Sequence, residues 1–292
     1  DLLPDERSVE WASEIIQRER KSPFFLALGF NRPHTPLYVP DKYFDMFPLE
    51  EIVLPPMPAD DLNDIPREGR RLQDGTARLY KTFYEHAGEQ GLKEFLQAYL
   101  ASIRFVDDQL GVLLKALDES SAGKNTLIVF TSDHGYHVGE KSRIGKNTCW
   151  ERSTHVPLIF AGAGVEARGV RVNQPVSQVD IYPTLLALCG LLESPNENVE
   201  APSLDGHSLA PFFTSDEQDM WSGPSVALSA TDHARTVRSE AYRYILHDGG
   251  GEELYDMDTD PNELKNLAPR KEFLETKMEL RELLEALGER KH

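Results

Sequence analysis

The sequence of 292 residues predicts an α/β protein with a mostly parallel sheet flanked by helices and a smaller C-terminal α+β subdomain. Short continuous apolar runs alternate with longer segments of helical periodicity, which is the pattern of a buried parallel sheet. The pattern changes after residue 215, where the apolar residues begin to alternate around glycines. We therefore expect an α/β domain over residues 1–215 and a subdomain over residues 216–292.

In chain order, helical spacing of apolar residues predicts a first helix at 8–20 with Ser8 as its N-cap. The run PFFLALGF at 23–30 predicts a strand buried on both faces, and the proline-rich segment NRPHTPLYVP ends it. Residues 45–75 are rich in Pro and Asp and predict a long surface loop, of a kind that is usually functional or mobile.

A long helical pattern follows at 88–119, and the runs TLIVFT at 126–131 and VPLIFAGAG at 156–164 predict two more buried strands. Residues 177–191 return to helical spacing. Asp180 is the expected N-cap of this helix, Pro183 lies in its first turn, and Gly190 is the expected C-cap. In the subdomain, we expect a hairpin around Gly249–Gly251 and a terminal helix at about 271–288.

Composition excludes two classes of protein. The chain has 49 acidic and 31 basic residues and a formal net charge of −18, which argues against a nucleic-acid partner. No apolar run approaches the roughly 20 residues of a membrane span. The two cysteines, Cys149 and Cys189, lack metal-type spacing. Both lie beside apolar residues and are expected to be buried, and a disulfide between them stays open.

Charged residues collect where predicted strands end. The first strand leads to Arg32 and His34, and the second leads to Asp133 and His134. In open α/β sheets, ligands bind outside the carboxyl ends of the strands. An adjacent Asp and His can present an oxygen and a nitrogen to one divalent cation. The alternative to a metal site is an ordinary turn in which the Asp133 side chain is solvated.

The turn after the second strand carries several cations. Lys146 can hold an anionic group as a point charge, and Lys141 and Arg143 are expected to add positive charge there. The alternative is that these three residues are solvated surface side chains with no role in a site. His137 and Glu140 are expected to order the loop, and His155 to pack at the start of the next strand.

The stretch FTSDHGYHVGEKSRIGKNTCWERSTHVPLIF resembles the second metal-binding motif of the sulfatase family, within the alkaline-phosphatase-like superfamily and nearest to its iduronate-2-sulfatase branch. The segments KSPFFLALGFNRPHTPLYVPDKYFDMFP and ELYDMDTDPNELKNLA match other landmarks in the family's order. The resemblance implies that Asp133 and His134 bind a divalent metal, usually Ca²⁺. It implies that Lys146 contacts the sulfate ester and that His34 lies near the leaving oxygen or the sulfate. It also implies a secreted, periplasmic or lysosomal location.

Two family features are absent from this sequence. Sulfatases use a formylglycine made within C/S-x-P-x-R, and the chain contains no such motif. The family's first Asp pair is also missing; Asp107 and Asp108 lie in the predicted 88–119 helix and are expected to be surface carboxylates. We expect an N-terminal segment, or a separate chain, to supply both features.

The resemblance therefore implies a sulfuric-ester hydrolase acting on a sulfated sugar. A phosphodiesterase or phosphonate hydrolase on the same scaffold is the first alternative. A non-catalytic fragment that binds sulfated glycan or a partner chain is the second.

Overall fold

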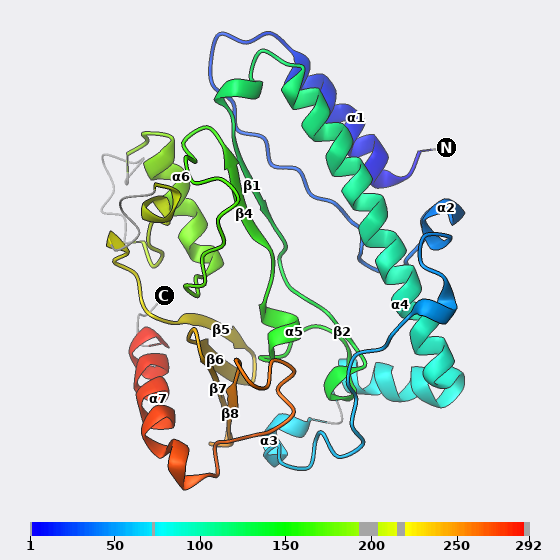
Figure 1. Cartoon of the computed structure of the whole chain (residues 1–292), viewed down its shortest axis with the longest axis vertical. Coiled ribbons are helices and arrows are strands. Elements are labelled where there is room, and N and C mark those ends of the chain that lie inside the picture. The colour runs from blue at the N-terminus through cyan, green and yellow to red at the C-terminus, as the bar shows by residue number, and fades with distance from the viewer. Residues whose placement is uncertain (1, 72–73, 193–203, 215–219, 289–292) are drawn as a thin grey trace. The chain divides into compact units, whose positions relative to one another are not determined.

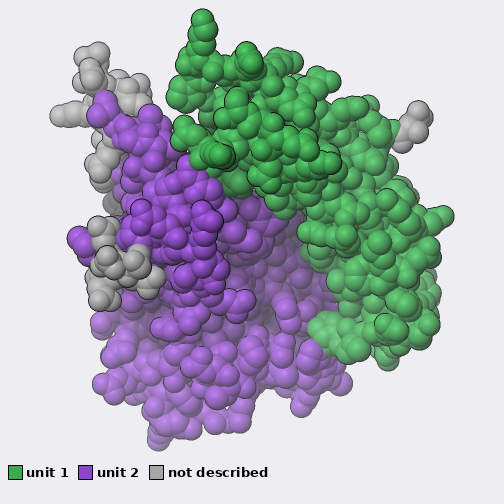
Figure 2. All heavy atoms as spheres, turned by 45° about the horizontal axis from the view of Figure 1, so that its top comes forward, with its two compact units in different colours: residues 1–55, 79–128 green, residues 56–78, 129–292 purple. Residues whose placement is uncertain are grey.

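The computed structural model describes residues 2–71, 74–192, 204–214 and 220–288 (Figure 1). The chain divides into two compact units, which Figure 2 colours separately. Unit 1 comprises residues 1–55 and 79–128, and unit 2 comprises residues 56–78 and 129–292. The predicted domain division at residue 215 stays a prediction.

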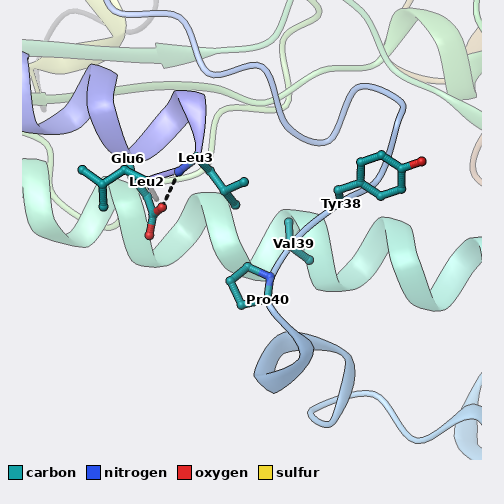
Figure 3. A pocket seen from close by; sticks show the side chains of 6 residues that line it. All are labelled: Leu2, Leu3, Glu6, Tyr38, Val39 and Pro40. Atoms are coloured by element: carbon teal, nitrogen blue, oxygen red, sulfur yellow. Dashed lines mark hydrogen bonds between the residues drawn. The ribbon is translucent and has the colours of Figure 1, made fainter.

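In unit 1, helix α1 (Pro4–Gln17) lies alongside the long helix α4 (Gly75–Asp118), as Figures 1 and 3 show. Helix α1 begins at Pro4 and not at Ser8, so the predicted N-cap is wrong. Proline suits the first helical position, and the Glu6 carboxylate accepts a hydrogen bond from the Leu3 amide at 2.7 Å. Ser8 instead donates to the main-chain oxygen of Pro4 at 3.0 Å.

Helix α4 consists of two parts. Gly88 has a non-helical backbone (φ 59°, ψ −156°), and the part that follows it matches the helix predicted at 88–119. The part before Gly88 was not predicted. Phe105 and Ala101 of α4 are fully buried, and Phe105 packs edge to face on Tyr43 of the short helix α2 (Asp41–Phe44) with 5.5 Å between ring centroids. These residues form the core of unit 1.

The strand predicted at 23–30 is not found in the described part of the chain. Residues 23–31 carry no strand or helix assignment, and the side chain of Phe25 is 82% exposed. An apolar run supplies only the propensity for a strand, whereas a strand also needs a neighbour to pair with. The described residues of the predicted loop at 45–75 are largely irregular and include the short helices η1 (Leu49–Glu51) and α3 (Arg67–Arg70), and α4 begins at Gly75.

Two strands lie where they were predicted. Strands β1 (Leu127–Thr131) and β4 (Leu158–Gly162) are hydrogen-bonded neighbours. The turn η2 (Gly123–Asn125) precedes β1. Helix α6 (Ile181–Leu188) follows β4 in the chain.

The N-terminal end of α6 agrees with the prediction, whereas its C-cap is Cys189 and not the predicted Gly190. Asp180 is its N-cap residue, at the end of the turn η4 (Gln178–Asp180), and its carboxylate accepts the amides of Ser177 at 2.7 Å and His207 at 2.8 Å. Gly190 follows the helix with φ 62°, a conformation that favours glycine. The turn η5 (Ala210–Phe213) lies against α6.

The C-terminal part forms an antiparallel sheet in the order β5-β6-β7-β8. Its strands are β5 (Ala227–Thr231), β6 (Ala234–Arg238), β7 (Tyr242–His247) and β8 (Glu252–Asp256). The predicted glycine hairpin joins β7 to β8. The turn η7 (Lys271–Phe273) leads into helix α7 (Leu274–Gly288), which contacts β6 and β7 (Figure 1). Their shared core contains residues with no exposed surface: Val237, Tyr244, Leu254 and Leu284.

Three further features bear on the sequence predictions. Cys149 and Cys189 are both free thiols; Cys149 is buried as expected, but Cys189 is exposed.

Among the residues that the structure describes, no helix combines the length and apolar character that a membrane crossing requires. Unit 1 contains an open pocket of about 580 Å³, and Figure 3 shows the side chains that line it: Leu2, Leu3, Glu6, Tyr38, Val39 and Pro40. None of the predicted site residues lines it.

Candidate active site

The predicted metal residues stand directly after β1. The strand ends at Thr131, and Asp133 and His134 follow within three residues. The hydroxyl of Ser132 donates to the main-chain oxygen of His134 at 2.9 Å, which closes a tight turn. The turn places both side chains at one end of the β1–β4 pair, where the parallel-sheet argument expected them.

Gly135 allows this turn to approach the short helix α5 (Glu151–Thr154). Its amide donates to the main-chain oxygen of Ser153 at 2.9 Å. A Cβ atom at position 135 would lie 2.0 Å from the main-chain oxygen of Arg152. Any residue with a side chain would therefore push the site away from α5.

The hydrogen bonds of His134 decide which ring nitrogen carries its proton. Its Nδ1 lies 2.8 Å from the main-chain oxygen of Gly135, which can only accept, so Nδ1 carries the hydrogen. The lone pair is then on Nε2, which lies 2.5 Å from Lys146 Nζ and 3.3 Å from Asp133 Oδ2. An imidazole lone pair, a carboxylate and an ammonium group thus meet at one point.

A tight hairpin brings Lys146 to this point. Strands β2 (His137–Val138) and β3 (Ile144–Gly145) pair antiparallel around the turn η3 (Glu140–Ser142). Left-handed backbone angles recur along it, at Gly139, Lys141, Ser142, Gly145 and Asn147. Such angles are uncommon for residues other than glycine, so tertiary contacts must hold them.

Lys141 and Arg143 do not contribute charge to the site, contrary to expectation. The Lys141 side chain is 2% exposed, and its Nζ lies 2.7 Å from Asp61 Oδ1. The Arg143 side chain is 1% exposed and lies 3.3 Å from the Asp74 carboxylate. Both cations are neutralised inside the protein. Of these three cations, only Lys146 reaches His134.

His137 and Glu140 make contacts that fit their expected role in ordering the loop. His137 is fully buried, and its Nε2 lies 2.8 Å from Thr148 Oγ1. Burial, with the charge of Arg143, lowers the pKa of His137 to about 3, so the ring is neutral. Glu140 accepts a hydrogen bond from the Val138 amide at 2.7 Å.

His155 differs from its expected position. Its side chain is 73% exposed, so it does not pack at the start of β4. Its Nδ1 lies 2.9 Å from Glu151 Oε1, and this hydrogen bond raises the pKa of His155 above its ordinary value.

His34 belongs to unit 1, whereas the other three predicted site residues belong to unit 2. Its amide donates to Asn31 at 2.9 Å, and its Nδ1 lies 2.6 Å from the main-chain oxygen of Thr35. The neighbouring Arg32 is buried, with its amide held by Asp5 at 3.1 Å. The convergence of His34 with Asp133, His134 and Lys146 stays a prediction.

Two family models match this chain, and together they cover most of its length. The family model described as sulfatase matches residues 3–191, which include all four predicted site residues. The chain belongs to the sulfatase family. A second model, described as the C-terminal part of N-sulphoglucosamine sulphohydrolase, matches residues 139–290.

Two curated relatives show how far the similarity extends. A sulfatase of Formosa agariphila is 42% identical over 272 residues, covering 93% of this chain and 51% of the relative. Human iduronate 2-sulfatase is 32% identical over 225 residues, covering 66% of this chain and 41% of the relative. The chain thus spans about half the length of the curated sulfatases it matches.

Solved structures confirm the alkaline-phosphatase-like fold class. A 2-O GAG sulfatase superposes with a TM-score of 0.75 at 26% identity, covering 98% of this chain and 64% of the other. A phosphonate monoester hydrolase of Agrobacterium radiobacter superposes with a TM-score of 0.77 at 26% identity, covering 96% and 60%.

The donors present fit one part of a divalent metal site. Asp133 Oδ2 and His134 Nε2 lie 3.3 Å apart, close enough to bind the same ion, and the Nε2 lone pair that a metal would use faces Lys146 Nζ at 2.5 Å in this structure. Within the described residues, no group of three or more His, Cys, Asp or Glu side chains could hold a metal. These two residues therefore account for only part of a coordination shell.

Asp107 and Asp108 lie on helix α4 in unit 1. Both pair with Arg104 on α4, and Asp108 Oδ1 lies 2.6 Å from its guanidinium. They are helix-surface carboxylates, as the sequence indicated.

Three supporting residues were missed by sequence reasoning. Gln178 donates to the main-chain oxygen of Ser132 at 2.5 Å and holds the end of β1. Asp61 and Glu263 both bind Lys141. Each partner is 46 or more positions away in the chain, so no local pattern could have indicated these contacts.

Proposed function

We propose that this chain contributes Asp133, His134, Lys146 and His34 to the active site of a sulfuric-ester hydrolase that acts on a sulfated sugar. The observation that supports this most strongly is the contact of Lys146 with His134, beside the Asp133 carboxylate. The Lys146 ammonium group and a metal ion held by Asp133 and His134 would together attract an anionic ester to the end of β1.

Lys146 is the residue we assign to the sulfate ester. Its ammonium group would neutralise charge that develops on the sulfuryl oxygens as the bond to the alcohol breaks. Because Lys141 and Arg143 are paired with Asp61 and Asp74, Lys146 carries this role without their help.

His34 is the residue we assign to the leaving oxygen. Its Nδ1 is engaged with the main-chain oxygen of Thr35, so Nε2 is the atom that would take up a proton and pass it to the departing alkoxide. The transfer requires that unit 1 and unit 2 bring His34 to the substrate.

We further propose that Asp133 and His134 hold a divalent cation, with Ca²⁺ as the family resemblance implies. Such an ion would supply positive charge to the sulfuryl oxygens. An imidazole ligand is unusual for Ca²⁺, which prefers oxygen donors. Direct measurement with several metals is therefore part of the test.

The nucleophile is proposed to come from outside these 292 residues. A formylglycine would supply a hydrated aldehyde as the nucleophile, and it is formed within C/S-x-P-x-R, which this sequence lacks. We propose that an N-terminal segment or a separate chain provides it. Such a segment would also carry the family's first Asp pair.

The substrate class rests on the names of relatives. Human iduronate 2-sulfatase and a 2-O GAG sulfatase both support a sulfated sugar. The net charge of −18 is no obstacle to an anionic substrate, because salt screens it beyond about 8 Å at physiological ionic strength. The nearby Lys146 would dominate at the site.

The alternative of a phosphonate or phosphodiester hydrolase is favoured by one observation, the superposition on a phosphonate monoester hydrolase. The alternative of a non-catalytic chain that binds sulfated glycan or a partner is favoured by the absence of the nucleophile motif.

The test is a paired assay of the full-length gene product with a sulfate monoester, a phosphonate monoester and a phosphodiester of the same alcohol. Sulfated uronic-acid sugars serve as natural-type substrates. Preferential hydrolysis of the sulfate supports the proposal, and preferential hydrolysis of a phosphorus ester would overturn it in favour of the first alternative. Glycan binding without turnover, together with no C/S-x-P-x-R in the gene or a partner, would favour the second.

A further inference from the structure

Glu263 makes an unusual set of contacts after strand β8. The residue is 2% exposed and has a left-handed backbone with φ 57°. Its carboxylate accepts a hydrogen bond from the Glu151 amide at 2.9 Å and lies 2.8 Å from Arg243 Nε. Its main-chain oxygen accepts a hydrogen bond from Lys141 Nζ.

These contacts reach both ends of one loop. Lys141 lies in η3, and Glu151 is the first residue of α5. Lys146 stands between them and extends to His134. Glu263 thus binds the loop that presents Lys146 where that loop begins and where it ends.

Glu263 also supports His134, the other partner of the Lys146–His134 contact, through helix α5. Helix α5 begins at Glu151, and the main-chain oxygen of its Ser153 accepts the Gly135 amide at 2.9 Å. The hydroxyl of Thr148 donates to Ser153 Oγ at 2.9 Å, which ties the end of the loop to the same helix. A displacement of α5 would therefore move both partners of the Lys146–His134 contact.

We infer that Glu263 is a positioning residue that sets the contact between Lys146 and His134, a role that rests on the function proposed for Lys146. The loop itself contains few regular hydrogen bonds and several left-handed residues. Such a loop keeps one conformation only when its ends are held. Glu263 contacts both ends from the segment that follows β8, where its carboxylate lies 2.8 Å from Arg243 of β7.

The backbone of Glu263 supports this assignment. A left-handed conformation is unfavourable for a residue other than glycine. Glycine would relieve that cost, but glycine has no carboxylate for Glu151 and Arg243. Glu263 keeps this unfavourable backbone conformation at a position where its main-chain oxygen binds Lys141 and its carboxylate binds the Glu151 amide.

The structure suggests three informative variants. Glu263→Gly keeps the left-handed backbone and the main-chain oxygen for Lys141 but removes the carboxylate. Glu263→Gln keeps one oxygen as an acceptor for the Glu151 amide, but it removes the charge and turns an NH2 group toward Arg243. Glu252→Gln is the matched control, because Glu252 binds Lys277 at 2.8 Å and its carboxylate has no described contact with residues 139–154.

Two measurements on this chain report on the loop without activity. Hydrogen exchange of the 139–148 amides measures how often the loop opens. The ¹⁵N resonance of His134 Nε2 measures its contact with Lys146, with Lys146→Ala as the reference for a lost contact.

In Glu263→Gly, we expect exchange in 139–148 to accelerate about tenfold or more, and the His134 resonance to move toward the Lys146→Ala value. In the full-length gene product, we expect the kcat of Glu263→Gly to fall by about 10-fold to 100-fold. Glu263→Gln should recover part of this loss, because it keeps the acceptor for the Glu151 amide, and Glu252→Gln should match the wild type.

An unchanged exchange rate and an unchanged His134 resonance in Glu263→Gly would overturn the inference. So would a displaced loop with wild-type kcat, provided that Lys146→Ala itself lowers kcat. Failure of the proposed function is recognised separately, because Lys146→Ala would then keep wild-type turnover.

Discussion

The ammonium nitrogen of Lys146 lies 2.5 Å from the Nε2 atom of His134, across 12 positions of the chain. The contact requires a neutral imidazole whose lone pair faces the lysine. That lone pair is also the one a metal ion would use. Substrate charge and metal charge would therefore act within one small region at the end of β1.

Lys146→Ala is expected to lower kcat of the full-length gene product by about 10²–10³-fold, similar to the loss of one oxyanion donor. The reason is the loss of the positive charge assigned to the sulfuryl oxygens. The measurement is steady-state hydrolysis of a sulfate ester, with Lys115→Ala as control, since the Lys115 side chain is 76% exposed. Wild-type turnover in Lys146→Ala would remove this residue from the site.

Removal of either metal donor is expected to weaken Ca²⁺ binding. Asp133→Ala and His134→Ala each delete one donor of the 3.3 Å pair, whereas Asp108→Ala removes a carboxylate that pairs with Arg104 on α4. Isothermal titration with Ca²⁺, Mg²⁺ and Mn²⁺ measures the affinities. Equal losses in the Asp108→Ala control would show that the effect is general charge removal.

Lys146→Met is expected to bind the same cation about tenfold more tightly than the wild type. A unit charge near 4 Å repels a cation by about 1 kcal/mol or more even in water, and the ammonium group also occupies the Nε2 lone pair. The same titration measures this gain. A lower affinity in Lys146→Met would mean that the metal does not use Nε2.

Lys141→Met is expected to destabilise the protein by about 3–5 kcal/mol, because it leaves Asp61 buried without a partner. The double variant Lys141→Met/Asp61→Leu should recover much of this loss, since no charge then remains buried. Urea unfolding of the single and double variants measures the difference. A loss below about 1 kcal/mol, the range of surface pairs, would contradict the assigned burial.

His137 is expected to make stability fall on acidification. Its pKa is lowered to about 3 in the folded protein, below the ordinary value of 6.5, so the unfolded chain binds the proton first. Its contribution is complete above about pH 6.5 and is lost as pH falls toward 3, by about 1.4 kcal/mol per unit. His137→Gln cannot be protonated and can still contact Thr148, so its unfolding free energy should vary less over this range.

The matched control for His137 is His86→Gln, because His86 is exposed on α4. Urea unfolding at pH 4, 5, 6 and 7 is compared for the three proteins. A pH profile of His137→Gln that parallels the wild type would show that the buried imidazole does not titrate as assigned.

The strand predicted at 23–30 was wrong because a strand forms only when another strand pairs with it, and the sequence of the segment does not show that neighbour. The run at 23–30 has the composition of a buried strand, yet Phe25 is 82% exposed and the segment pairs with no described strand. The strands at 126–131 and 156–164 were predicted by the same criterion and do pair. Composition reports what a segment prefers, and pairing depends on which other segment is present.

The sequence by itself predicted strands β1 and β4, helix α6, and the position of Asp133 and His134 directly after β1. These follow from short-range patterns, in which spacing and residue type act on immediate neighbours. Tertiary structure alone decided which cations face the site. Lys141 and Lys146 are both lysines of one loop, but Asp61, 80 positions away, draws Lys141 into the interior and leaves Lys146 to His134. A charge is buried only where a distant partner compensates the loss of water, and no local pattern records that partner.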